Sequence, residues 1–246
     1  CVPTVTGAWQ QEGGGAFFNN AAIWKFDKTL IEGLDVLDES VRRLDQSKIG
    51  RILTGDAEAL HNGPPVKAML IQNTNPMTVA PEQALVRQGF AREDLFVAVH
   101  EQFMTETAMM ADIVLPATMF MEHDDLYYAG GNQHISVGAK LIDAPEECRS
   151  NHDVLQGIAT RLGAKHRAFG MHPRDIIDET LQVSGRGGIE GLEADKWRDI
   201  QPDFRTSHYL DGFAHADGKF HFKADWSTVP MPNAGLMGAW DEMPSF

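Results

Sequence analysis

VKAMLIQNTNPMTVAPEQ (Val66–Gln83) and LFVAVHEQFMTETAMMADIVLPATMFMEHDD (Leu95–Asp125) are the two stretches of sequence that decide the fold. They contain three short apolar runs, at Ala68–Ile71, Leu95–Val99 and Ile113–Leu115, none of which alternates with polar residues. Such runs are typical of strands buried on both faces of a parallel sheet. The sequence therefore predicts an α/β fold with an open, mostly parallel sheet and helices on both faces.

Helix signals separate the three runs. Pro81 and Glu82 are suited to the first turn of a helix, because proline lacks only an N–H that would be unpaired there and an acidic residue favours the positive end of the helix dipole. Thr105 is a good N-cap for a short helix that ends near Ala111. This βαβαβ alternation, with right-handed crossovers, predicts a Rossmann-like core over residues 64–120.

Polar residues follow each of the three runs. In open α/β sheets the ligand lies outside the carboxyl ends of the strands. The residues at these ends are Asn73, Thr74 and Asn75, then His100 and Glu101, then Thr118. They are candidate ligand contacts, although the same side chains could simply cap loops.

The core divides the chain into three expected segments. Residues 1–63 combine a glycine-rich loop, Gly13–Gly15, with a helical stretch that leads into the core. Residues 64–120 form the core itself, and residues 121–246 form a flanking α+β part. No internal repeat is present.

Three elements are expected in the flanking part. Ser150 with Asp153 predicts a capping box for a helix at 151–162, whose apolar face would carry Val154, Leu155, Ile158, Ala159 and Leu162. A second helix is expected over Pro173–Val183, with an inward face that carries Ile176, Ile177, Thr180 and Leu181. Asp217-Gly218, between two apolar stretches, predicts a hairpin near residues 213–223.

Composition excludes several classes of protein. The 246 residues carry a formal net charge of −14, from 21 Lys and Arg against 35 Asp and Glu. That surface would repel a nucleic-acid backbone. Cys1 and Cys148 form no metal-binding pattern, and their scarcity fits a reducing compartment, so we expect a cytoplasmic protein. No apolar run reaches the length of a transmembrane helix.

The ordered set of NTNP, EDLFVAVHEQFMTETAMMADIVLPATMFMEHDD and the earlier TGAWQQEGGGAFF resembles molybdopterin-dinucleotide oxidoreductases of the dimethyl-sulfoxide-reductase type, which include formate dehydrogenases and nitrate reductases. The resemblance extends from Gly7 to about Gly163. It implies a segment of the large catalytic subunit, with a bis-molybdopterin guanine dinucleotide cofactor that carries molybdenum or tungsten. Any iron–sulfur cluster would belong to the full-length protein and lie outside this chain.

The resemblance also implies a set of cofactor-binding residues: Asn73, Thr74, Asn75, His100, Glu101, His123 and Asn151. Glu101 stands where relatives usually have Asp, and its carboxylate would accept two N–H bonds from guanine. His123 stands where many relatives have Lys, which weakens a contact to phosphate. The molybdenum ligand lies outside the match, so no catalytic and no metal-binding residue is assigned.

The resemblance implies three partners: a small-molecule substrate, the remainder of the large subunit and an electron-transfer subunit. We also expect this chain alone to retain no molybdenum.

Two alternatives remain open at this stage. The His, Glu and Asp residues between 100 and 125 could serve a metal-dependent hydrolase, although no HExxH spacing is present. The core could also be a nucleotide-binding module without catalysis, although GxGxxG is absent.

Overall fold

The computed structural model describes residues 1–16, 24–129 and 132–222. The chain forms two compact units from interleaved segments. The parallel-sheet unit comprises the described residues of Gly33–His123 and Lys140–Gly170, and the antiparallel-sheet unit comprises those of Cys1–Glu32, Asp124–Ala139 and Met171–Pro230. The sequence predicted three consecutive segments, which differ from this division. Turn residues in a sequence show where a helix or strand ends, but they do not show in which core the next element packs.

The parallel-sheet unit contains two 3-10 helices, five α-helices and three strands among its described residues. In chain order they are η3 (Gln46–Lys48), α3 (Ile49–Leu53), β1 (Ala68–Gln72), α4 (Pro76–Val79), α5 (Gln83–Phe90), β2 (Phe96–Glu101), α6 (Glu106–Met109), β3 (Ile113–Pro116), α7 (Asn151–Leu162) and η4 (Arg167–Gly170).

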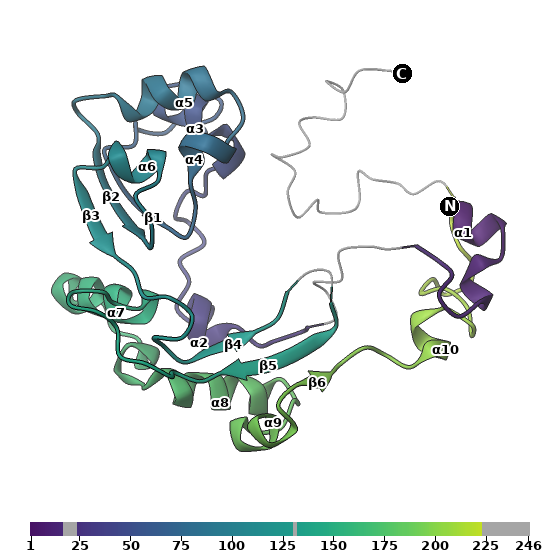
Figure 1. Cartoon of the computed structure of the whole chain (residues 1–246). Helices are drawn as coiled ribbons and strands as arrows, with labels where there is room; N and C mark the ends of the chain where they lie inside the picture. Colours follow the sequence, from purple (N-terminus) through teal and green to yellow (C-terminus); the bar gives the residue numbers. More distant parts are fainter. Residues whose placement is uncertain (17–23, 130–131, 223–246) are drawn as a thin grey trace. The chain divides into compact units, whose positions relative to one another are not determined.

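The three strands of this unit form the predicted parallel sheet (Figure 1), in the order β1-β2-β3. Ala68 pairs with Phe96 and His100 pairs with Leu115, so the strands run in register to a common carboxyl edge. A mixed α/β fold with a parallel core is thus confirmed.

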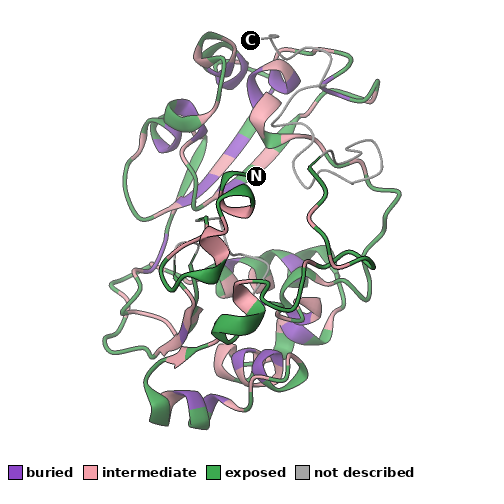
Figure 2. Ribbon diagram, turned by 90° about the vertical axis from the view of Figure 1, so that its right-hand side faces the viewer, coloured by how far each residue is buried: buried purple, intermediate pink, exposed green. Residues whose placement is uncertain are grey.

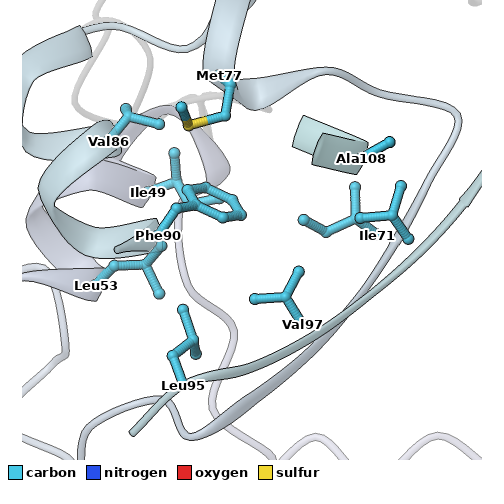
Figure 3. Close-up of a cluster of buried hydrophobic side chains, with 10 residues drawn as sticks. Ile49, Leu53, Ile71, Met77, Val86, Phe90, Leu95, Val97 and Ala108 are labelled. Atoms are coloured by element: carbon cyan, nitrogen blue, oxygen red, sulfur yellow. The ribbon is translucent and has the colours of Figure 1, made fainter. Parts of the chain in front are cut away.

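Helices α3 to α6 cover one face of this sheet. Figure 3 shows their apolar side chains gathered with those of the strands around Phe90, in a cluster that also contains Ile49, Leu53, Ile71, Met77, Val86, Leu95, Val97, Val99 and Ala108. Two glycines bring α3 against α5: a Cβ at Gly50 would lie 2.8 Å from the Val86 nitrogen, and one at Gly89 would overlap Leu53.

On the opposite face of the sheet, the prediction of helices is met only in part: His100 is buried there against residues 149–151 at the start of α7, whereas much of the rest of this face is exposed in the described structure. Side chains alternate along a strand, and paired residues of parallel strands share a face. Leu70 and Ile113 both pair with Ala98 on this face, and they are 38% and 45% exposed, with Phe96 of the same face 47% exposed. An apolar run shows which side chains favour burial, but not whether the chain supplies a cover for them.

The antiparallel-sheet unit has its own elements and core. The elements are α1 (Val2–Val5), η1 (Ala8–Gln10), α2 (Thr29–Glu32), β4 (Asp125–Tyr127), β5 (His134–Gly138), α8 (Pro173–Val183), α9 (Ile189–Asp195), β6 (Arg198–Asp199) and α10 (Phe204–Ser207). The strands follow the order β4-β5-β6, with antiparallel pairing. Its core contains Trp24, Ile135, Ile177, Leu181, Ile189 and Leu192. Figure 2 shows buried and exposed residues sharing the same helices, as amphipathic helices require.

Two predicted helices are present with their expected bounds. Ser150 caps α7, since its hydroxyl accepts from the Asp153 nitrogen at 3.2 Å and the Asp153 carboxylate accepts in return. Gly163 ends α7 in the left-handed conformation. Helix α8 covers Pro173–Val183, as predicted.

Other details of the helices differ from the expectation. Helix α5 begins only at Gln83, because Glu82 adopts a left-handed φ of 54° and Pro81 precedes it. On α7, Val154 and Ala159 are buried, whereas Leu155, Ile158 and Leu162 are 43%, 37% and 79% exposed. Their spacing is correct for an amphipathic face, but no described residue covers most of that face.

The hairpin expected near 213–223 is not formed in its described part. Residues 213–222 contain a turn and no strand, with the Phe213 nitrogen donating to the Gly218 oxygen. Phe220 instead packs edge-on against Phe213 and Phe222. The alternation of KFHFK therefore produces an aromatic cluster and not a sheet pair, and Lys223 lies outside the described residues.

Candidate functional site

The carboxyl ends of β1, β2 and β3 meet the beginning of α7. The Arg149 nitrogen donates to the Pro116 oxygen, and the Thr118 nitrogen donates to the Arg149 oxygen, each at 3.1 Å. This pairing forms an isolated parallel bridge between Ala117 and Arg149. We call the residues gathered here, 72–75, 100–102, 116–118 and 149–151, the strand-end edge.

Asn75 uses its full hydrogen-bonding capacity within the chain. Its amide nitrogen donates to Glu106 Oε2 at 2.9 Å and to Thr78 Oγ1 at 3.1 Å. Its amide oxygen accepts from the Thr107 hydroxyl at 2.7 Å and from the Thr107 nitrogen at 3.3 Å. An asparagine amide has two donors and two acceptor positions. Asn75 therefore joins the β1–α4 connection to α6 and has no donor left for a ligand.

Glu106 is held ionised by the same contacts. It accepts from Asn75 and also from the Thr78 hydroxyl at 3.0 Å. The bond from Asn75, its own backbone N–H and the bond from Thr78 lower the pKa of Glu106 below its ordinary value of 4.5. A negative charge thus lies beside the strand-end edge, on an exposed side chain.

His100 is completely buried, and both of its ring nitrogens have partners. Nε2 lies 3.0 Å from the Arg149 carbonyl oxygen, and Nδ1 lies 3.1 Å from Nε2 of Gln72. A carbonyl can only accept and an amide NH₂ only donates, so the contacts assign the proton to Nε2. His100 therefore holds the edge together, and neither ring nitrogen is directed to a ligand.

Glu101 lies on the opposite face from His100, because successive side chains of a strand alternate. Its Oε1 accepts from the Gln102 backbone nitrogen at 2.7 Å, while Gln102 Nε2 donates to the Thr118 oxygen at 2.8 Å. In the described part of the chain, Oε2 of Glu101 has no hydrogen-bond partner. Glu101 is half-buried. It thus caps its own loop with one oxygen and keeps the other available.

Asn73 and Thr74 are the exposed members of the first strand end. Asn73 has a φ of 56°, a left-handed conformation that asparagine tolerates better than most residues. No described residue forms a hydrogen bond with either side chain. The pair thus presents an amide and a hydroxyl that are available to a ligand.

His123 reaches the edge through Thr118. The Thr118 hydroxyl lies 2.7 Å from His123 Nδ1, and Thr118 itself is buried. Glu122 caps the preceding turn, since its Oε2 accepts from the Met119 nitrogen at 2.9 Å. At the other end of the edge, Asn151 is exposed and its Oδ1 accepts from Gln72 Nε2 at 3.4 Å. Six of the seven predicted residues thus lie within the edge, and His123 contacts it.

Gln72 and Arg149 are members of the edge that the sequence did not single out. Gln72 is the last residue of β1, and Arg149 lies just before the Ser150 cap. The exposed Arg149 guanidinium has no ion-pair or hydrogen-bond partner among the described residues. Gln72 could have been found from the sequence, because it is the polar residue that ends an apolar run. No local pattern indicates that Arg149 pairs with the end of β3.

Sequence comparison decides the family. The model of the molybdopterin oxidoreductase family matches residues 5–161. The chain belongs to this family. The resemblance expected from Gly7 to about Gly163 is thereby confirmed.

The similar members of the molybdopterin oxidoreductase family are much longer than this chain. The probable oxidoreductase YoaE of Bacillus subtilis is 38% identical over 164 residues, which cover 66% of this chain and 23% of YoaE. The assimilatory nitrate reductase catalytic subunit of the same organism is 24% identical, with 68% and 25% covered. A formate dehydrogenase alpha subunit that depends on F420, from Methanococcus maripaludis, is 30% identical, with 55% and 21% covered. The chain thus spans about a quarter of the length of these relatives.

Structural comparison supports the fold of this molybdopterin oxidoreductase segment. Acetylene hydratase from Pelobacter acetylenicus superposes with a TM-score of 0.53 at 23% identity, over 68% of this chain and 23% of the hydratase. Within the part of the chain that the structure describes, no helix combines the length and the apolar character needed to cross a membrane.

Membership in the molybdopterin oxidoreductase family implies a pterin cofactor with molybdenum or tungsten. The open groups of the strand-end edge fit an organic, polar part of such a cofactor: an amide and a hydroxyl from Asn73 and Thr74, one carboxylate oxygen from Glu101 and the guanidinium of Arg149. Among the described residues, no group of three His, Cys, Asp or Glu side chains could hold a metal ion. The alternative of a metal-dependent hydrolase therefore has no ligand set here.

Proposed function

We propose that this chain is part of the catalytic subunit of a molybdenum or tungsten oxidoreductase and binds the guanine dinucleotide part of a bis-molybdopterin cofactor at the strand-end edge. In this proposal the parallel-sheet unit is a Rossmann-like nucleotide-binding core. The observation that carries the proposal is the open carboxylate oxygen of Glu101, at the carboxyl end of the central strand and within the residues matched to the family.

Each open group has a chemical counterpart on a guanine nucleotide. Guanine presents two N–H donors on one edge, and a carboxylate accepts such a pair more strongly than a neutral amide does. Thr74 and Asn73 match the ribose hydroxyls, which both donate and accept. The metal, when bound, supplies two-electron redox chemistry, and the protein binds and orients the cofactor.

The complete enzyme would bring further partners. The chain spans only about a quarter of the length of its relatives. We therefore propose that the small-molecule substrate is bound by the full-length protein and not by this segment alone. By the same reasoning, the remainder of the large subunit packs with this segment and an electron-transfer subunit accepts or delivers electrons.

Glu101→Gln tests the guanine assignment. The substitution keeps the shape but places an NH₂ where a donor of guanine would point. We expect the chain to bind GDP in preference to ADP, and the variant to lose about tenfold to a thousandfold in affinity for GDP, roughly 1.4–4 kcal/mol. Isothermal titration with both nucleotides measures these affinities.

Glu93→Gln is the matched control. Glu93 is exposed and lies in the turn before β2, at the other end of the same strand, so the change removes one charge from the same unit. The control should bind GDP with wild-type affinity. Equal affinities of the Glu101 variant and the wild-type chain, or no preference for GDP over ADP, would end the assignment.

A further inference from the structure

A continuous chain of hydrogen bonds runs along the strand-end edge behind the proposed ligand contacts. It begins at Asn151, passes to Gln72 at 3.4 Å, continues to His100 at 3.1 Å and ends at the Arg149 carbonyl at 3.0 Å. Three different elements contribute to it: β1, β2 and the segment that opens α7. None of these bonds belongs to the backbone pairing of the sheet, so these side chains add to the backbone contacts of Arg149 in fixing this part of the edge.

The direction of each bond is set by its chemistry. Gln72 donates both hydrogens of its amide, one to Asn151 Oδ1 and one to His100 Nδ1. His100 donates from Nε2 to the Arg149 oxygen, which also accepts from the Thr118 nitrogen. Because His100 is fully buried, water does not compete for its ring nitrogens and the ring orientation is fixed.

The two residues at the ends of this chain of bonds have exposed side chains whose chemistry suits a nucleotide. Asn151 is exposed at the first position of α7, and the Arg149 guanidinium is exposed without a partner among the described residues. In a chain with a net charge of −14, an unpaired guanidinium beside the edge is a suitable contact for a diphosphate.

We propose that Gln72 and His100 are positioning residues: Gln72 holds the side chain of Asn151 and His100 holds the backbone of Arg149, so that both residues are placed for the ribose and diphosphate of the bound nucleotide. The inference rests on the proposed function and deepens it. It moves His100 from the ligand contacts to the support behind them and adds Gln72, which touches no ligand. Preorganised groups bind more tightly, because the cost of ordering them is met during folding and not on binding.

A double-mutant cycle with GDP as the probe tests the proposal. Gln72→Leu removes both donors at nearly constant size, and Asn151→Ala removes the group that Gln72 holds. If Gln72 acts through Asn151, each single variant loses about tenfold in affinity for GDP, and the double variant loses no more than the larger single loss. Losses that multiply in the double variant would show that the two residues act independently and would overturn the proposal.

Two further variants make the test decisive. Val86→Ala removes buried volume from α5 and lowers stability without touching the edge, so its affinity for GDP should remain that of the wild type. Gln72→Met serves if Gln72→Leu does not fold: it also removes both amide donors at nearly constant size, and the same coupling with Asn151→Ala is expected.

The outcomes separate this inference from the proposed function. A wild-type chain that does not bind GDP would overturn both. A wild-type chain that binds GDP, together with a Gln72→Leu variant of unchanged affinity, would overturn the positioning role and leave the guanine site standing.

Discussion

Glu106 shows at the scale of one residue how the strand-end edge depends on pH. Its carboxylate accepts from Asn75 and Thr78, and these bonds place the folded-state pKa below the ordinary 4.5. A carboxyl group whose pKa is lower in the folded state stabilises the fold above its ordinary pKa, and this contribution is lost as the pH falls through the lowered value.

We expect the free energy of unfolding to fall as the pH drops below about 4.5, and to fall less steeply in Glu106→Gln. Above that pH the variant should be less stable than the wild type, because an amide is a weaker acceptor than a carboxylate. Urea denaturation of both proteins across this range measures the difference between their free energies of unfolding. Asp94 and other carboxylates contribute similarly in both proteins, so their effect cancels in this difference. Parallel pH profiles would contradict the assignment to Glu106.

Sequence reasoning found where the polar residues of the edge lie but not what each one does. Asn75 and His100 were predicted as ligand contacts because they follow apolar runs. Their hydrogen bonds are instead used by Thr107 and Arg149, which are 32 and 49 positions further along the chain. A local pattern carries no information about such distant partners. The loop contact of Glu101 was easier to predict from the sequence, because it is formed with the next residue in the chain.

At the scale of elements, the strands and helix caps could be predicted from the sequence. Which elements pack against each face of the sheet and of α7 could not. The three parallel strands, the Thr105 cap of α6 and the Ser150 capping box of α7 each follow from a few neighbouring residues. The exposed Phe96 face of the sheet and the exposed Leu162 of α7 depend on what packs against them. Amphipathic spacing indicates a preference for burial, and a partner must satisfy it.

Ser150→Ala tests whether the cap contributes as its geometry indicates. The hydroxyl satisfies the Asp153 nitrogen at the start of a 12-residue helix, and its loss should lower the free energy of unfolding by about 0.5–2 kcal/mol. Chemical denaturation followed by circular dichroism measures this change.

Thr160 is an exposed residue within the same helix, and Thr160→Ala should raise the free energy of unfolding. The Thr160 hydroxyl bonds back to the Gln156 oxygen, and alanine has the higher helix propensity. If both variants were destabilised equally, the difference between cap and interior would not hold.

At the scale of the whole molecule, each of the two units has its own main core among the described residues. The parallel-sheet unit is organised around Phe90 and its neighbours, and the antiparallel-sheet unit around Trp24, Ile135 and Leu181. The two clusters share no residue, and the chain passes between the units several times. The sequence predicted the first core from its apolar runs. Of the second core it predicted only the inward face of the helix over Pro173–Val183, with Ile177 and Leu181, because Trp24 and Ile135 lie far from that helix along the chain and form no common pattern with it.

A matched pair of substitutions tests whether each core stabilises its own unit. Leu53 is 1% exposed in the first cluster and Leu181 is 0% exposed in the second, so Leu→Ala removes the same atoms from each. Each change should cost about 2–5 kcal/mol through lost burial and the cavity left behind. Hydrogen exchange, resolved by residue, should show reduced protection of β1 and β2 in Leu53→Ala, and of β5 and α9 in Leu181→Ala. If either variant lowered protection equally in both sheets, the two clusters would be parts of one cooperative core, and the division of the chain into two units would have no energetic meaning.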